Sequence, residues 1–287
     1  MKRLFYIVGF CFLVWLSQSC QKEIEFDLPN VEQTLVLEGT LESGQPPVVF
    51  LTNSQGYFDP IDSSTFQNVF AHDANVVLFN GTENITLDEY TNPINGLSVY
   101  TSLDPAAVGT YGTNYKLTVQ LDDKELIART KIPNPLALDS LWFEAYPAYD
   151  SLGFIWARFT DPDTVGNCYR WFAQRINSYL YNYPAPYDDV LGQMKDNRPL
   201  APIGSSTDDK LFNGLTFDFI ATRGEDGIFE GPDDEGIEEG FFKRGDTVVI
   251  KSTTITYPTY LYVRSMENAA VSNGSIFSSP GNLPYNV

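Results

Sequence analysis

This chain has few of the residues on which disulfide and nucleophile chemistry depend. It contains three cysteines and a single histidine, His72, in 287 residues. Cys11 and Cys20 lie in the first twenty residues, so only Cys168 remains beyond them and no disulfide can form within the rest of the chain. A Gly-x-Ser-x-Gly motif is absent, and no Cys/His pair has the spacing of a zinc site. We therefore expect a protein that is not an enzyme, in which Cys168 is a buried small apolar residue rather than a nucleophile.

Basic residues are also scarce. Lysine and arginine number 18 against 37 aspartates and glutamates, which gives a formal net charge of −19. An acidic surface repels phosphate backbones, so we expect no nucleic-acid partner. Apolar residues at 43% and aromatic residues at 14% are nevertheless enough to build cores, which excludes a disordered acidic polymer.

Hydrophobic runs are short as well, and the longest one lies near the start. Residues 4–16 form an apolar run of 13 residues that follows two basic residues. A membrane-spanning helix needs about 20 apolar residues, so this run has the length of a signal-peptide core instead. The small residue Ser19 followed by Cys20 resembles the lipobox of bacterial lipoproteins, in which the cysteine becomes a lipid-bearing N-terminus. We predict a signal peptide over 1–20 and a lipid anchor on Cys20; the alternative is a secreted protein cleaved near Ser19, with Cys20 a free thiol.

A short acidic segment follows this cysteine. Glu23, Glu25 and Asp27 lie within residues 21–30, and the pattern resembles the export signal that sends lipoproteins of Bacteroidetes-type bacteria to the outer face of the outer membrane. We predict a tether over 21–30 and a location in the outer membrane, facing the exterior. The alternative is a solvated linker that carries no address.

Short segments of alternating apolar and polar residues dominate the remainder, and turn residues separate them. Such segments predict β-strands, and Asn80-Gly81 between two of them is a strong hairpin signal. The predicted strands cover 34–38, 48–52, 76–79, 85–87, 97–102, 115–121, 126–130, 138–146, 154–160, 168–176, 215–221 and 246–254.

The segment 132–135 interrupts this pattern with two prolines, which cannot lie in a central strand. We place a domain boundary there. The predicted fold is mainly β, with two β-sandwich (Ig-like) domains at 31–133 and 137–287. One short helix is expected near the C-terminus, over 260–270, with Thr259 as its N-cap.

A segment with many carboxylates is the first candidate site. Residues 224–240, GEDGIFEGPDDEGIEEG, interleave acidic residues with glycines, and calcium prefers six to eight oxygen ligands. The spacing is not that of an EF-hand. We therefore expect a solvated hairpin tip and no cofactor; the alternative is a calcium site with Asp226, Glu230, Asp233, Asp234 and Glu235 as ligands.

A belt of tyrosines is the second candidate. Tyr179, Tyr181, Tyr183 and Tyr187 alternate with prolines and small residues. Exposed tyrosines give contact area at low entropic cost, which suits a protein partner or a sugar ring. The alternative is a loop packed back on its own domain.

Several short motifs follow one another along the chain: Leu-Val-Leu-Glu-Gly at 35–39, Gly-Thr-Tyr at 109–111, Phe-Thr-Asp-Pro at 159–162 and Tyr-Arg-Trp at 169–171. In order and spacing they resemble the DUF4249 family of Bacteroidetes outer-membrane lipoproteins. The resemblance covers the chain from Cys20 onward. It implies a companion of TonB-dependent outer-membrane receptors and supplies no catalytic residues. Family members tend to continue into a Gly-rich aromatic segment, so the resemblance also implies that the second domain is truncated at its end.

We therefore expect a surface-exposed, non-enzymatic lipoprotein that partners a TonB-dependent β-barrel receptor in nutrient capture. A free-standing surface adhesin or glycan-binding module is the alternative. A hydrolase that uses a pair of carboxylates also stays open, because such enzymes need only two acidic residues at a set separation.

Overall fold

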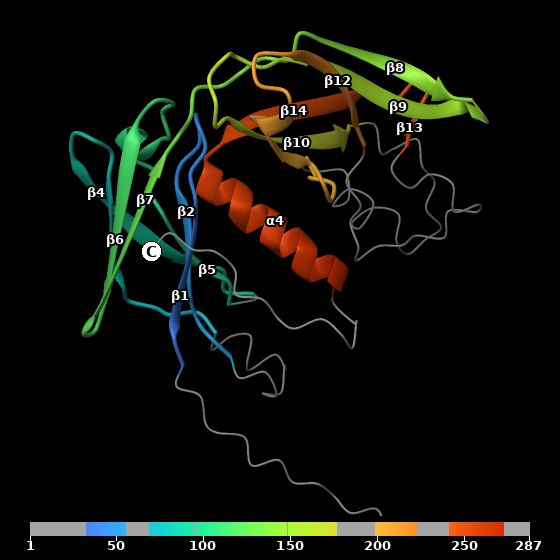
Figure 1. Ribbon diagram of the computed structural model, residues 1–287. Helices are drawn as coiled ribbons and strands as arrows, with labels where there is room; N and C mark the ends of the chain where they lie inside the picture. Colours follow the sequence, from blue (N-terminus) through green and yellow to red (C-terminus); the bar gives the residue numbers. More distant parts are fainter. Residues whose placement is uncertain are drawn as a thin grey trace, which may run out of the picture.

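The computed structural model describes residues 33–55, 69–94, 96–147, 149–176, 199–222 and 241–272. Within these ranges the chain is mainly β, with one α-helix near the C-terminus (Figure 1). This part of the predicted fold class is confirmed. No helix in the described ranges is long and apolar enough to cross a membrane.

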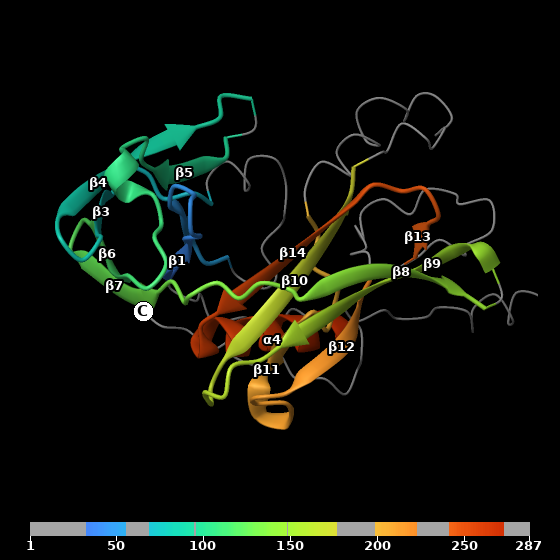
Figure 2. The same ribbon diagram turned by 90° about the horizontal axis from the view of Figure 1, so that it is seen from above.

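The first half of the chain forms one antiparallel seven-stranded sheet, in the order β1-β2-β5-β4-β3-β6-β7. Its strands are β1 (Leu35–Thr40), β2 (Val48–Asn53), β3 (Asn75–Phe79), β4 (Asn84–Thr91), β5 (Ser98–Thr101), β6 (Asn114–Leu121) and β7 (Lys124–Lys131). A 3₁₀ turn, η1 (Pro105–Ala107), follows β5. Figure 2 shows the sheet curling round into a near-barrel.

This sheet differs from the predicted Ig-like sandwich, which has two separately bonded sheets. The reason lies in β4, which changes partner along its length. Its residues 84–87 pair with β3, whereas its residues 88–91 pair with β5. Strand β4 therefore joins what would otherwise be two sheets into one continuous, curled sheet.

Strict alternation of side chains builds the core of this sheet. Successive residues of a strand point to opposite faces, and in β3 Val76 and Leu78 are buried while their neighbours are more exposed. The same holds in β6 for Tyr115, Leu117 and Val119. The buried apolar residues from all these strands form one cluster, so the predicted half-buried strands are confirmed here.

The predicted hairpin at Asn80-Gly81 is confirmed, with a loop of residues 80–83 between β3 and β4. The Asn80 side-chain oxygen accepts hydrogen bonds from the Thr82 and Glu83 amides at 3.0 and 2.9 Å. Gly81 has φ +95°, which glycine adopts without strain.

The second half contains two small sheets. Strand β9 (Tyr149–Thr160) pairs with all three other strands of a four-stranded sheet: β8 (Ser140–Tyr146), β12 (Thr216–Ala221) and β13 (Phe242–Lys243). Strand β10 (Cys168–Arg175) is central in a three-stranded sheet, between β11 (Ser206–Asp208) and β14 (Val248–Ile255). The turn η3 (Asp209–Leu211) follows β11. The two-residue β13 and three-residue β11 are too short for an alternating pattern, so sequence analysis did not find them.

Helix α4 (Tyr257–Ser272) begins three residues before the prediction. Its cap is Thr256 rather than Thr259, because the Thr256 hydroxyl oxygen accepts a hydrogen bond from the Thr259 amide at 3.3 Å. Pro258 lies in the first turn, where a helix does not need the missing N–H, so it does not delay the start. The helix packs on β10 and β11, with Val263 buried.

Contacts also join the two halves of the chain. Lys251 Nζ of β14 lies 2.5 Å from Glu42 Oε2, in the segment between β1 and β2. Burial raises the pKa of Tyr262 on α4, and the charge of Glu38 on β1 adds to this shift. The helix and β14 thus lie beside the first sheet.

Gly109 offers a test of packing within the first half, because it lies against the backbone of the segment after β1. A Cβ atom at this position would lie 2.2 Å from the Glu42 carbonyl oxygen. We expect Gly109→Ala to lower the free energy of unfolding by about 1–3 kcal/mol, as overpacked sites do, measured by urea denaturation. Gly39→Ala is the matched control, since its Cβ would meet nothing closer than 3.7 Å; equal midpoints for the two variants would contradict the argument.

Candidate functional site

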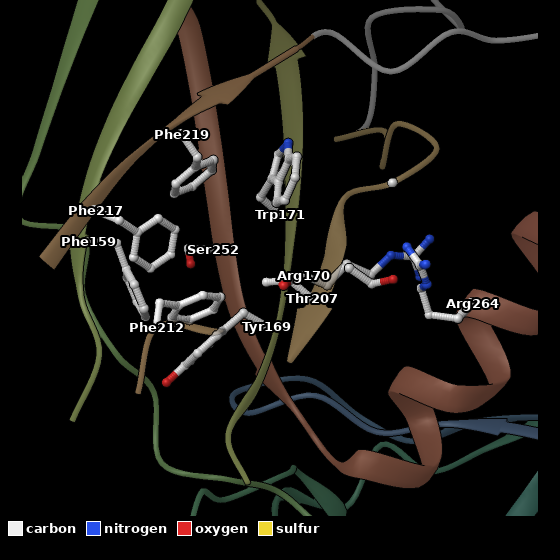
Figure 3. Close-up of a pocket in the computed structure, with 12 residues that line it drawn as sticks. Phe159, Tyr169, Arg170, Trp171, Thr207, Phe212, Phe217, Phe219, Ser252 and Arg264 are labelled. Carbon is white, nitrogen blue, oxygen red and sulfur yellow. The ribbon is translucent and has the colours of Figure 1, made fainter. Parts of the chain in front are cut away.

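A pocket of about 320 Å³ lies in the second half, beside β10 (Figure 3). Its walls come from both small sheets and from α4. The lining residues are Phe159, Tyr169, Arg170, Trp171, Gly204, Ser206, Thr207, Phe212, Phe217, Phe219, Ser252 and Arg264.

Aromatic rings form one side of the pocket. Tyr169 and Trp171 point to the same face of β10 and meet rings from the other sheet. The Tyr169 and Phe159 ring centroids lie 4.6 Å apart, edge to face, and those of Trp171 and Phe219 lie 5.0 Å apart. Phe159 and Tyr169 are buried, whereas Trp171 and Phe219 are half-buried. The inner rings therefore belong to the core, and the outer rings leave apolar surface open to a ligand.

Asp161 holds Tyr169, one of the buried rings on this aromatic side. It is only 2% exposed, and it accepts hydrogen bonds from the Tyr169 hydroxyl at 2.5 Å and from the Gly214 amide at 3.0 Å. Burial raises the pKa of Tyr169 far above its usual value, and the hydrogen bond to Asp161 adds to the shift. Asp161 thus holds Tyr169 and the 212–215 turn in place.

Two arginines form the polar side. Arg170, between Tyr169 and Trp171, points to the opposite face of β10, where Arg264 of α4 meets it. The Arg170 Nε atom is buried without a hydrogen-bond partner. Burial lowers the pKa of Arg170, and the charge of Glu267 opposes that shift. Within the described ranges, neither arginine forms an ion pair.

Other hydrogen-bond donors on the pocket lining are also unused. The Ser206 hydroxyl and the Trp171 indole Nε1 are buried and have no hydrogen-bond partner. Ser206 is 3% exposed. Buried polar groups are nearly always hydrogen-bonded in proteins, so each of these unused donors calls for an explanation.

The single histidine lies elsewhere, in a polar cluster around Glu89 of β4. The groups that donate to this carboxylate are Ser98 Oγ at 2.5 Å, His72 Nδ1 at 2.5 Å, the Asp73 amide at 3.0 Å and the Tyr100 hydroxyl at 3.2 Å. Burial would raise the pKa of Glu89, but these hydrogen bonds outweigh it and lower the pKa to about 2. The Ser98 hydroxyl donates to the carboxylate and not to the imidazole, so the cluster lacks the nucleophile–base contact of a catalytic triad.

Cys168 is fully buried, as predicted. Burial raises the pKa of its thiol to about 11, with smaller contributions from Asp208 and Asp209. A thiol with this pKa stays protonated at neutral pH and is a poor nucleophile.

The predicted site residues fall outside the described ranges. These are Cys20, the calcium candidates Asp226, Glu230, Asp233, Asp234 and Glu235, and the tyrosines Tyr179, Tyr181, Tyr183 and Tyr187. No group of three or more His, Cys, Asp or Glu side chains that could hold a metal ion occurs among the residues that the structure does describe. These predictions therefore stay predictions.

Sequence analysis did not find the pocket, although part of its signal was visible. Tyr169-x-Trp171 and Phe217-x-Phe219 each place two aromatic rings on one face of a strand. Both segments were predicted as strands. That these two faces meet, and that Arg170 reaches α4, depends on contacts between distant segments.

The fold and the pocket define a mainly β protein with an aromatic, arginine-bearing site. Residues 21–287 match the family described as a domain of unknown function, DUF4249. The chain belongs to this family, as its motifs indicated. No curated protein and no solved structure matches it.

The buried Tyr169–Asp161 contact yields a prediction of stability. In Tyr169→Phe the carboxylate keeps the Gly214 amide and loses its hydroxyl donor, so we expect the free energy of unfolding to fall by about 1–3 kcal/mol. Urea denaturation measures this change. The control is Tyr111→Phe, since Tyr111 is 56% exposed and its variant should unfold like the parent; an unchanged Tyr169→Phe midpoint would show that the contact contributes nothing.

The Glu89 cluster yields a prediction of pH dependence. The pKa of Glu89 lies near 2 in the folded chain, against an ordinary value of 4.5 for glutamate, so its stabilising effect is complete above about pH 4.5 and is lost as the pH falls toward 2. We expect Glu89→Gln to lower the free energy of unfolding by about 1–2 kcal/mol at pH 7, and this deficit to shrink at pH 3.

Urea midpoints at the two pH values test the Glu89 prediction. Asp88→Asn, which removes the exposed neighbouring carboxylate, is the matched control and should track the parent at both. A Glu89→Gln deficit of equal size at pH 7 and pH 3 would contradict the proposed role of the carboxylate.

Proposed function

We propose that this protein is a lipid-anchored accessory protein of the outer membrane, facing the exterior, which helps a TonB-dependent β-barrel receptor to capture a nutrient. It binds its ligand without chemically changing it. The lipid on Cys20 holds it at the membrane, and the segment 21–30 tethers the folded part.

The observation that carries this proposal is the pocket beside β10. Half-buried rings such as Trp171 and Phe219 offer apolar surface, and unused donors lie next to them. Concave, largely apolar sites with a few convergent polar groups are typical of ligand-binding sites. Among the described residues that line the pocket, none is a carboxylate, histidine or thiol that could act as a base or nucleophile, so binding is the function that the pocket supports best.

Other observations support the lipid anchor on Cys20 and the partnership with a TonB-dependent receptor. The signal core, the cysteine at position 20 and the acidic segment after it indicate a surface lipoprotein. The companion role with TonB-dependent receptors follows from the resemblance to other DUF4249 proteins. Attachment to the same membrane raises the effective concentration of the two partners, so a weak interface suffices for assembly.

Affinity purification from detergent-extracted membranes tests this proposal. We expect the full-length protein to recover a TonB-dependent β-barrel, because both partners share the outer membrane. Cys20→Ser is the control, since it lacks the thiol for lipid attachment; it should leave the membrane fraction, fail to incorporate an alkyne-labelled fatty acid and recover far less receptor. Recovery of no β-barrel by the lipidated protein would overturn the proposed partnership, whatever the outcome of lipid labelling.

A further inference from the structure

We propose that the ring-lined side of the pocket beside β10 binds a small uncharged molecule with one aromatic ring and one hydroxyl or similar hydrogen-bonding group. This ligand class deepens the proposed binding function and rests on it. Only the face of β10 that carries Tyr169 and Trp171 takes part, and the arginines on the other face do not.

Five aromatic side chains on this face form a circuit, which we call the aromatic cup: Trp171, Phe219, Phe217, Phe159 and Tyr169 (Figure 3). Successive ring centroids lie 5.0, 6.1, 5.5 and 4.6 Å apart in that order. The last residue lies two positions before the first on β10, so the strand itself closes the circuit. No further ring contact joins any two of the five. The rings therefore border a space and do not fill it.

The aromatic cup is closed at one end and accessible at the other. Phe159 and Tyr169 are buried, and the ring of Phe212 packs beside that of Tyr169. Trp171 and Phe219 are only half-buried, so part of their surface stays open. A ligand ring that enters beside these two side chains meets ring faces and edges, against which it packs in offset or edge-to-face geometry.

One free hydroxyl, that of Ser252, lies among these rings (Figure 3). Ser252 of β14 is the register partner of Trp171, and directly paired residues place their side chains on the same face of a sheet. Ser252 is half-buried and forms no hydrogen bond through its side chain with any described residue. A hydroxyl both donates and accepts, so it can pair with one polar group of a ligand.

The other hydroxyls on this side of the pocket already have partners. The Tyr169 hydroxyl donates to Asp161 at 2.5 Å, and the Thr207 hydroxyl donates to the Asp208 carbonyl oxygen at 3.2 Å. Ser252 is therefore the hydroxyl that this side leaves for a ligand, which is why we assign the ligand a single hydrogen-bonding group.

The aromatic cup carries no charge. Among the described residues that line the pocket, the charged ones are Arg170 and Arg264, and both lie on the opposite side of β10 (Figure 3). Removing an ion from water without an opposite charge is strongly unfavourable, whereas a neutral ring gains free energy from burial. The aromatic cup therefore favours an uncharged ligand over an ion of the same shape.

The size of the pocket limits the ligand to one ring. Its volume of about 320 Å³ lies at the small end of the range of about 300–1,000 Å³ for ligand sites. That volume also includes the side of the pocket that the arginines line. The part that the aromatic cup borders is smaller, so it suits one ring and not two.

Four probes of similar size test the ligand class. The first, p-cresol, has the ring and the hydroxyl; toluene lacks the hydroxyl, 4-methylcyclohexanol has a saturated ring, and 4-methylbenzoate carries a negative charge. At pH 7 the phenol is protonated and the carboxylate is ionised. Titration calorimetry on the mature chain at 150 mM salt, where long-range repulsion from the acidic surface is screened, measures each affinity.

We expect p-cresol to bind at millimolar concentration or below. Binding of 4-methylbenzoate should be at least about tenfold weaker, because its charge finds no partner in the aromatic cup. Binding of 4-methylcyclohexanol should be about two- to tenfold weaker, because the contacts between aromatic rings are lost. No binding of p-cresol at millimolar concentration, or equal binding of 4-methylbenzoate, overturns the proposal. Because no receptor is present in the titration, either result leaves the partnership with a β-barrel to its own test.

A variant that fills the space assigns binding to the aromatic cup. Ser252→Leu places an aliphatic side chain among the rings and should weaken p-cresol binding by about tenfold or more, since it occupies the place of the ligand ring. Ser140→Leu is the matched control, because Ser140 is exposed on β8 and does not line the pocket. Its affinity for p-cresol should equal that of the parent, and equal affinities of the two leucine variants would overturn the proposed site.

Ser252→Ala tests the hydrogen bond and keeps the proposal testable even where Ser252→Leu does not fold. The preference for p-cresol over toluene, taken as the ratio of their affinities, should fall by about two- to tenfold in this variant, because the hydroxyl partner is gone. A merely structural role for Ser252 would change both affinities alike and leave the ratio as it is. An unchanged ratio would therefore show that the ligand hydroxyl does not bind where we place it.

Discussion

The second half of the structure depends on the alternation of side chains along a single strand, β10. Residues 169 and 171 point to one face of the strand and residue 170 to the other, as the pleat of a strand requires. One face meets the aromatic rings of the neighbouring sheet, and the other meets α4. A shift of one residue in the pairing of β10 with β14 would exchange these faces and put a guanidinium among the rings. The register from Cys168↔Ile255 to Arg175↔Val248 is therefore what puts the aromatic rings and the guanidinium of Arg170 on opposite faces of the sheet.

The first sheet plays a different part, which is to support the second half from one side. Strand β4 joins the sheet into a single curled body around one apolar cluster. Glu42, in the segment after β1, then contacts β14, and Glu38 of β1 acts electrostatically on α4. Because α4 carries Arg264, contacts with the first sheet help to fix the position of one wall of the pocket. Side-chain interactions thus connect the two halves, in addition to the chain itself.

Local pattern predicted most of the strands and the helix, since alternation and turn residues act over a few positions. It did not predict that β4 divides its pairing between β3 and β5, because that division depends on segments far apart in the sequence. The helix start differed for a local reason: two threonines lie three residues apart, and Thr256 rather than Thr259 is the cap, with Pro258 tolerated in the first turn. The pocket, like the partner change in β4, could not be predicted from local sequence pattern. The ring pairs at 169–171 and 217–219 were visible in the sequence, but their meeting was not.

Arg170 is half-buried and forms no ion pair among the described residues; its guanidinium lies over the Phe172 ring, 5.1 Å from the centroid. A charge placed in this way costs stability. Burial lowers the pKa of Arg170, which means that its surroundings disfavour the charge that it carries. An apolar residue of similar length would fill the same space without that penalty. The nearby Glu267 reduces the penalty only through space, since it makes no direct ion pair within the described part of the chain. The structure thus holds a half-buried positive charge that Phe172 and Glu267 compensate only in part.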